Sequence, residues 1–159
     1  MIEVKGLKKL QAKLRNLQNI EHRTAPLMTQ LGEILKNSIE DSFENETSPF
    51  GKRWKPLSKS TLKNKLKKGE SERILRREGN LADRWLLKTT NTKASVSNNA
   101  SYKGFAYGLI HQFGSNKAGR SRNIKIRARP FLPVDKSGKL AKIVKLEVEN
   151  EIIGFIKKI

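Results

Sequence analysis

We predict an α+β domain for this sequence, in which long N-terminal and C-terminal helices pack on a small antiparallel sheet and a basic loop lies beside them. Two long segments carry apolar residues at helical spacing, one opening at Thr24 and one near Asp135. Between them, residues 86–97 are rich in threonine and β-branched residues, and residues 123–129 alternate apolar and basic side chains. Both patterns are typical of strands. The 159 residues most simply form one domain, residues 1–159, that buries roughly two-thirds of its unfolded surface.

The composition restricts the class of protein. No cysteine is present, which excludes disulfides and thiolate metal sites. The opening sequence MIEVKGLKKL lacks the apolar run of a signal peptide, and no stretch approaches the roughly 20 apolar residues of a membrane span. We therefore expect a soluble protein made in the cytoplasm, with no membrane partner.

The formal net charge is +19, and its distribution is more informative than its size. No acidic residue occurs from Thr47 to Gly69 or from Arg84 to Val134, although both stretches are rich in lysine and arginine. Such segregation creates a positive field that favours polyanions through counterion release. A solubilising lysine surface explains the composition equally well, because charge speaks to partners and not to fold.

The first part of the chain is predicted to form two helices. The first has a narrow leucine stripe that could pack on the domain or on a neighbouring subunit: Leu7, Leu10, Leu14 and Leu17. The second opens with Thr24 as N-cap and Pro26 in its first turn, and its apolar residues cover a wide arc. Its late acids, Asp41, Glu44 and Glu46, oppose the helix dipole. We expect them to face cations elsewhere, for which the basic segment that follows is a candidate.

An irregular loop follows, with three turn residues, Pro49, Gly51 and Pro56. Trp54 is its large apolar anchor, and we expect it to attach the loop to the core rather than to stack on bases. Ser58 or Ser60 can cap a short helix that runs to Lys68.

Three shorter elements are predicted next. Asn80 can cap a short helix from Leu81 to Trp85. Residues 86–97 form a hairpin that turns near Asn91. The apolar residues from Phe105 to Phe113 are helically spaced, which indicates a short buried helix. 

The last element is a long helix that starts at Asp135 or Ser137 and nearly reaches Ile159. Its apolar face consists of Leu140, Ile143, Val144, Val148, Ile152, Phe155, Ile156 and Ile159.

The alternating segment is predicted to present cations on one face. Its apolar residues, Ile124, Ile126 and Ala128, fall on a face that can pack on a core. The basic residues between them fall on the other face, roughly 6.6 Å apart. The candidate DNA-facing or assembly surface combines these cations with those of the preceding loop and of the short lysine-rich helix: Arg120, Arg122, Lys125, Arg127, Arg129, Lys63 and Lys67.

Nothing in the sequence indicates catalysis. The two histidines, His22 and His111, are far apart in the chain and belong to no metal-ligand spacing. We expect His111, among apolar neighbours, to be a hydrogen-bonded structural residue. A magnesium-dependent nuclease needs clustered carboxylates, and the most basic segments contain none. The loop GSNKAGR lacks the spacing of a nucleotide-binding loop. We therefore expect neither an enzyme, nor a cofactor, nor a metal site.

Four motifs occur in order along the chain: Pro49-Phe50-Gly51-Lys52-Arg53-Trp54-Lys55-Pro56-Leu57-Ser58 with Thr61-Leu62, Ile74-Leu75-Arg76 before Gly79-Asn80-Leu81, Tyr107 with Ile110-His111-Gln112-Phe113-Gly114, and Ala128-Arg129-Pro130-Phe131-Leu132. Their order and spacing resemble the phage virion morphogenesis (tail completion) family, which includes the G protein of Mu-like phages and prophages. The resemblance covers residues 43–134. It implies a structural role for Pro49, Gly51, Trp54, Leu57, Thr61, Leu75, Tyr107, His111, Gln112, Phe113, Gly114, Arg129, Pro130, Phe131 and Leu132.

The resemblance implies a non-enzymatic virion assembly protein that acts in head–tail joining or tail completion, as a neck component and a ring-forming homo-oligomer. Its partners would be other head, neck or tail proteins, with non-specific DNA contact as a further expectation. It would be found in the virion and, during assembly, in the host bacterial cytoplasm. The alternative from a different class is a non-specific nucleic-acid-binding protein that uses the basic strand and the lysine-rich helix.

Overall fold

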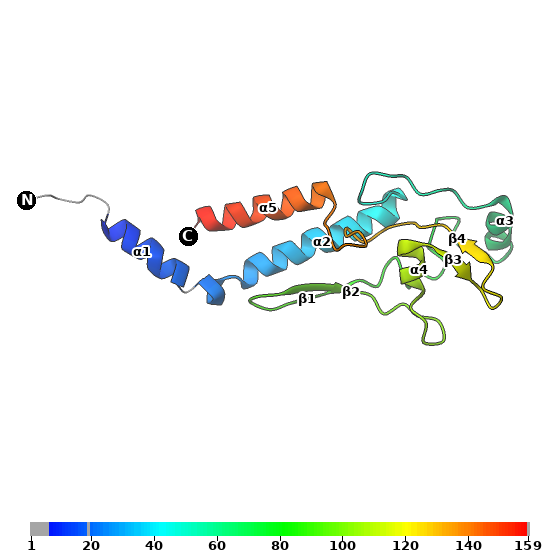
Figure 1. Cartoon of the computed structure of the whole chain (residues 1–159), viewed down its shortest axis with the longest axis horizontal. Coiled ribbons are helices and arrows are strands. Elements are labelled where there is room, and N and C mark those ends of the chain that lie inside the picture. The colour runs from blue at the N-terminus through cyan, green and yellow to red at the C-terminus, as the bar shows by residue number, and fades with distance from the viewer. Residues whose placement is uncertain (1–6, 19, 159) are drawn as a thin grey trace, which may run out of the picture.

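The computed structural model describes residues 7–18 and 20–158, and it confirms the predicted α+β class (Figure 1). The two strand pairs are separate antiparallel sheets, β1–β2 and β3–β4. The predicted position Ile159 lies outside the described residues. In chain order the elements are α1 (Leu7–Gln18), the 3-10 helix η1 (Ile20–Arg23), α2 (Ala25–Asn45), α3 (Lys59–Lys67), β1 (Leu86–Thr89), β2 (Ala94–Ser97), α4 (Tyr107–Phe113), β3 (Ser115–Ala118), β4 (Ile124–Ile126) and α5 (Lys142–Lys157).

Helix α2 is the middle layer of the molecule, with α5 on one side and the hairpin β1–β2 on the other (Figure 1). The predicted hairpin is confirmed, with Thr89 opposite Ala94 across its turn. Gly32 allows the close approach of this hairpin, because a Cβ at that position would lie 2.3 Å from Cδ1 of Leu87. The predicted start of α2 is also confirmed, but the Thr24 hydroxyl donates to the carbonyl of Asn91 instead of capping the helix. This bond joins the start of α2 to the hairpin turn.

The hydrophobic core lies around the C-terminal end of α2. The Phe43 ring is 5.6 Å from that of Trp54 and 5.1 Å from that of Phe131. The indole Nε1 of Trp54 donates to the carbonyl of Pro130 at 2.9 Å. The prediction that Trp54 attaches its loop to the core is therefore confirmed. The other buried members of this core are Ile39, Ile74, Leu81, Ala82 and Trp85.

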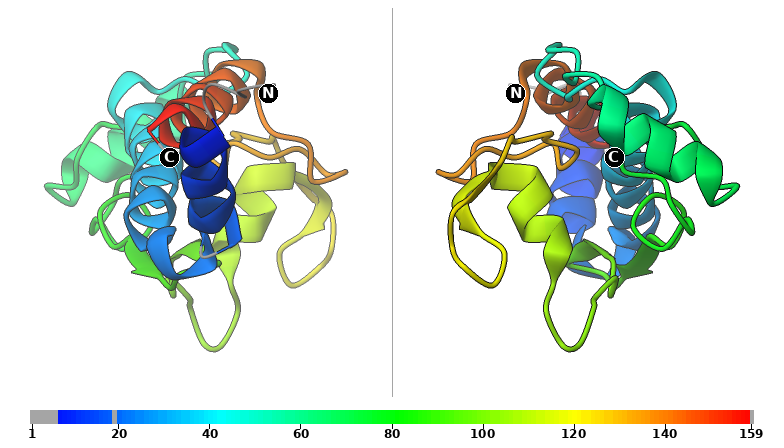
Figure 2. Two further views of the ribbon diagram at one scale, coloured as in Figure 1. Left: turned by 90° about the vertical axis from the view of Figure 1, so that its left-hand side faces the viewer. Right: turned by 90° about the vertical axis from the view of Figure 1, so that its right-hand side faces the viewer.

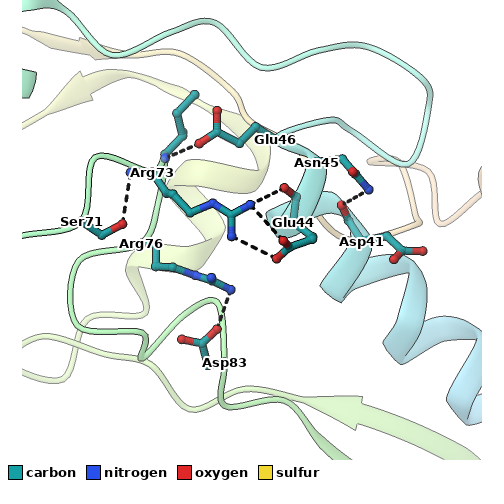
Figure 3. A network of polar contacts seen from close by, with 9 residues as sticks. Asp41, Glu44, Asn45, Glu46, Ser71, Arg73, Arg76 and Asp83 are labelled. Carbon is teal, nitrogen blue, oxygen red and sulfur yellow. Dashed lines mark hydrogen bonds and ion pairs between the residues drawn. The ribbon is translucent and has the colours of Figure 1, made fainter.

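A polar network connects the end of α2 to the segment that contains Ile74 (Figure 3). The Arg73 guanidinium donates to both carboxylate oxygens of Glu44 at 3.0 and 3.1 Å and to the Glu44 carbonyl at 2.6 Å. Glu46, in the left-handed conformation with φ 51°, accepts the Ile74 N–H at 2.6 Å. The Arg73 hydrogen bond and charge lower the pKa of Glu44. Glu44 thus faces a cation, as expected, but that cation comes from residue 73 and not from the basic segment directly after the helix.

Two predicted helices differ from the structure. Residues 81–85 form no helix. Their first part is a turn, in which the Asp83 N–H donates a hydrogen bond to the Gly79 carbonyl at 2.8 Å. The amide of Asn98 donates to the carbonyls of Asn80, Leu81 and Arg84, which satisfies acceptors that a helix would have paired with backbone N–H groups. The C-terminal helix begins at Lys142, because the Asp135 carboxylate accepts the N–H groups of Ser137 and Lys139 and closes a turn there. 

The predicted buried helix and basic loop are also shorter than expected. Helix α4 begins at Tyr107, and only Gln112 among its residues is buried. Phe105 and Leu109 are 55% and 58% exposed. The first residues of the expected loop form strand β3, which pairs with β4 through Ser115 opposite Ile126. The short lysine-rich helix is confirmed as α3, with the Ser58 hydroxyl accepting the Thr61 N–H at 3.2 Å.

Candidate functional site

A groove of about 830 Å³ lies between the loop of residues 48–55 and the hairpin β3–β4. Aromatic and aliphatic side chains contribute to its lining: Phe50, Trp54, Phe113, Ile126 and Pro130. Its cationic residues are Lys52, Arg53, Lys55, Lys125, Arg127 and Lys136. No acidic residue is among the residues that line it. We call this set of residues the cationic groove.

The loop side of the groove is a compact hydrogen-bonded turn. The Ser48 N–H donates to the Lys52 carbonyl and the Gly51 N–H donates to the Ser48 carbonyl, both at 2.8 Å. The backbone N–H of Trp54 donates to the Glu46 carbonyl, also at 2.8 Å, while the indole ring lies in the core. This arrangement fixes the backbone that carries Lys52 and Arg53.

The hairpin side is positioned by Gly114, which has φ +74° between α4 and β3. A Cβ on Gly114 would lie 3.0 Å from the Ala128 nitrogen and 3.1 Å from the Ile126 carbonyl oxygen. The Arg129 N–H donates to the His111 carbonyl at 2.7 Å, so the chain after β4 runs beside the end of α4. Glycine at position 114 therefore permits the contact that holds the hairpin against the core.

The Gln112 side chain joins α4 to the Pro-Phe-Leu segment. Its Oε1 accepts the N–H groups of Phe131 and Leu132, each at 2.9 Å. Its Nε2 donates to the carbonyls of Leu132 at 3.4 Å and Val134 at 3.3 Å. Gln112 is only 2% exposed, and these bonds satisfy backbone groups of a buried or partly buried segment.

The predicted basic face of residues 123–129 is confirmed only in part. Lys125 and Arg127 are exposed and line the groove. Arg129 instead donates from Nε and Nη2 to the Lys55 carbonyl at 3.3 and 3.0 Å and is half-buried, so its role is structural. The apolar face does not pack as predicted either, since Ile124 is 54% exposed. Among the described residues β4 pairs with β3 alone, and this two-stranded sheet has no further strand beside it, which leaves that face uncovered.

The predicted surface is also divided in space. Arg120 and Arg122 lie at the exposed turn of the β3–β4 hairpin, whereas Lys63 and Lys67 lie on α3. Seen along the long axis, α3 and this hairpin lie on opposite sides of the molecule (Figure 2). Four cations of the groove were not assigned to the site from the sequence: Lys52, Arg53, Lys55 and Lys136. The acid-free stretch from Thr47 to Gly69 was the signal for three of them.

His111 lies beside a second cavity, of about 670 Å³, which Tyr107 and Arg129 also line. The expectation of a hydrogen-bonded histidine is wrong for Nδ1, which is buried and has no hydrogen-bond partner among the described residues. Burial and, secondarily, the charge of Arg129 lower the pKa of His111 below its ordinary value of 6.5. The folded protein therefore resists protonation of this imidazole.

We expect this histidine to make stability depend on pH near neutrality. Because the pKa of His111 is lowered by folding, the unfolded chain binds a proton more readily, and stability falls as the pH drops below about 6.5. Urea unfolding midpoints at pH 7 and pH 5.5 should differ more for the natural protein than for His111→Gln. Equal differences in the two proteins would contradict this origin of the pH dependence.

The described residues hold no cluster of three or more His, Asp or Glu side chains that could bind a metal ion. In the same part of the chain, no helix has the length and apolar character to cross a membrane.

The cationic groove and the exposed apolar residues of α1 and α5 are features of surfaces that bind other macromolecules. The chain belongs to the phage virion morphogenesis family, whose sequence profile matches residues 5–153. Its role is therefore in the assembly of phage particles.

Two proteins illustrate what the chain is similar to. The chain is 30% identical over 137 residues to the Mu-like prophage FluMu G protein 2 of Haemophilus influenzae. The matched region covers 82% of this chain and 81% of that protein. It is 32% identical over 107 residues to an uncharacterized protein of Methanocaldococcus jannaschii. This match covers 63% of this chain and 71% of that protein. No solved structure is significantly similar.

Proposed function

We propose that this protein acts in head–tail joining or tail completion, as a non-enzymatic neck component that forms a ring-shaped homo-oligomer. The observation that carries the proposal is the cationic groove, which three motifs of the family resemblance line together. The first motif contributes the loop with Lys52 and Arg53, another ends in Phe113-Gly114, and the last begins at Ala128, directly after Arg127. A groove with several cations, apolar walls and no acid suits an acidic, partly apolar segment of a neighbouring virion protein.

DNA is the other polyanion that the groove could contact. A neck must let DNA pass during ejection, so its contacts with phosphate should be weak at physiological salt. The exposed cations Arg120 and Arg122, at the turn of the β3–β4 hairpin, suit such transient contacts. In this proposal DNA contact accompanies assembly and does not replace it.

The alternative function, non-specific nucleic-acid binding, is favoured by the same exposed hairpin cations. It predicts that a monomer binds DNA tightly, with an affinity that falls steeply with salt. The assembly function predicts an oligomer in the absence of DNA and weak DNA binding at physiological salt. Sedimentation without DNA, combined with a salt titration of DNA binding, distinguishes the two.

Deleting the gene from an inducible phage that carries it should abolish infectious particles. We expect electron micrographs of the induced lysate to show filled heads and tails that are separate, or tails of aberrant form. Expression of the intact protein in trans should restore joined particles, which controls for effects on neighbouring genes. Normal infectious particles in the deletion lysate would contradict the proposed function.

A further inference from the structure

One wall of the cationic groove has an unpaired backbone edge at Arg53. Thr47 and Arg53 form an antiparallel bridge, whose two hydrogen bonds join the residues on either side of them. In such a bridge the N–H and C=O groups of the two central residues turn away from each other. The N–H and C=O of Arg53 therefore point away from Thr47, and neither has a hydrogen-bond partner among the described residues.

The opposite wall contains the free edge of β4. In the part of the chain that the structure describes, β4 has β3 as its one neighbouring strand, and Ser115 pairs with Ile126. The Ile126 carbonyl oxygen lies 3.1 Å from the position that a Cβ on Gly114 would take, so the Ile126 backbone faces β3. Successive residues of a strand turn their backbone groups to opposite edges, so those of Arg127 face away from β3. They too lack a hydrogen-bond partner among the described residues.

The two edges border the same space. Residues 52–55 and residues 125–128 line the groove from its two sides. At one end the two segments are joined, because the Arg129 guanidinium donates to the Lys55 carbonyl. Groups two residues apart in an extended chain face the same edge, so the Arg53 edge is turned to the chain that follows β4. The groove thus lies between two unpaired backbone edges.

The charges beside these edges favour an acidic strand. Exposed cations lie on both walls: Arg53, Lys55, Lys125 and Arg127. An unpaired edge is a template for another strand, and like charges along it oppose the pairing of two identical edges. A strand that carries carboxylates would instead satisfy the backbone groups and contact the cations. The apolar side chains in the lining suit the alternate residues of such a strand.

We propose that the cationic groove binds its partner by β-strand addition. An extended acidic segment of a neighbouring virion protein pairs its main chain with the edges at Arg53 and Arg127. The inference rests on the proposed function, since it specifies how the groove holds an acidic virion partner. In this mode of recognition the main-chain hydrogen bonds supply affinity, and pockets for alternate side chains supply specificity.

A designed peptide tests the binding mode. The probe is acetyl-TVEVEVET-amide, which alternates valine and glutamate as an acidic strand would. At low salt the full chain should bind it with a Kd of about 1 mM or tighter. The amide protons of Arg53 and Arg127 should exchange more slowly in the complex. The same peptide N-methylated on every valine and glutamate keeps its charges without these donors, and it should bind at least about tenfold more weakly.

Matched substitutions separate main-chain pairing from charge. Arg53→Gln and Arg53→Pro both remove the charge, but only proline also removes the N–H. Arg127→Gln and Arg127→Pro form the second pair. Each proline variant should bind the peptide at least about tenfold more weakly than its glutamine counterpart. Circular dichroism and urea unfolding check that each variant is folded, and the N-methylated peptide tests the pairing with the natural protein.

The proposal is overturned if the peptide does not bind, if N-methylation leaves its affinity unchanged, or if both proline variants bind like their glutamine counterparts. A loss in one proline variant alone supports strand addition and assigns it to that edge. If the peptide fails to bind while the gene deletion still leaves heads and tails unjoined, the proposed function stands and the binding mode is wrong. If the peptide pairs with the groove but the deletion lysate is normal, the binding mode stands and the proposed function is wrong.

Discussion

Replacing Gln112 by methionine is expected to destabilise the protein by about 2–4 kcal/mol, because the buried N–H of Phe131 and the partly buried N–H of Leu132 lose their acceptor, and an unsatisfied buried donor costs about 1–3 kcal/mol. The N–H groups of Phe131 and Leu132 now donate to Oε1 of Gln112, each at 2.9 Å. Methionine has nearly the same shape, so the loss reports hydrogen bonds and not a cavity. A domain of this size is typically stable by about 5–15 kcal/mol, so urea unfolding should detect the change easily.

Leu109→Met is the matched control for this prediction. Leu109 lies on the same short helix but is 58% exposed, so its change to methionine should alter stability by no more than about 0.5 kcal/mol. If Gln112→Met costs as little as Leu109→Met, other groups satisfy the Pro-Phe-Leu backbone and Gln112 has no such structural role.

Local patterns in the sequence were sufficient where local physics determines the structure. The wide apolar arc of residues 25–45 predicted α2, and the threonine-rich stretch predicted the β1–β2 hairpin, because both periodicities are strong and their neighbours reinforce them. Trp54 was predictable as an anchor because a large aromatic side chain in a polar loop gains most from burial. The start of α3 followed from Ser58, whose hydroxyl caps it.

Other features depended on partners that are distant in the sequence. Asn98 supplies donors for the carbonyls of Asn80, Leu81 and Arg84 in the turn that stands where a helix was predicted, and no pattern near Asn80 indicates this. Asp135 was predicted to start a helix, but its carboxylate accepts the N–H groups of Ser137 and Lys139 and closes a turn. Any Asp at such a position can make this turn in place of a helix cap.

The candidate site could be predicted only in its charge. The acid-free stretches identified the cations, but which of them face the same groove depends on tertiary contacts. Arg129 alternates with Lys125 and Arg127 in sequence, yet its guanidinium turns to the Lys55 carbonyl. In the structure, Lys52 and Arg53 lie across the groove from the hairpin β3–β4. The core beneath joins segments that are far apart in the chain, and no local pattern shows this.

Neutralising four groove cations, Lys52, Arg53, Lys125 and Arg127, to glutamine should reduce infectious particles by at least about 100-fold while the protein remains folded. All four side chains are exposed, so their loss should change stability little. Each contact between such a cation and an acidic partner is worth about 1 kcal/mol, and four together account for a 100-fold or larger effect on binding. The measurement is plaque formation by a deletion phage supplied with the variant in trans.

The matched control removes four charges from α3 and its C-cap instead, with Lys59, Lys63, Lys67 and Lys68 changed to glutamine. This variant has the same net charge as the groove variant, but its changes lie outside the groove, on α3 and its C-cap Lys68, opposite the hairpin β3–β4 (Figure 2). If binding depends on the groove, the α3 variant should restore plaques nearly as well as the natural protein. Equal losses in both variants would mean that only total charge matters, as non-specific attraction to DNA requires, and would favour the nucleic-acid-binding alternative over docking of an acidic virion partner.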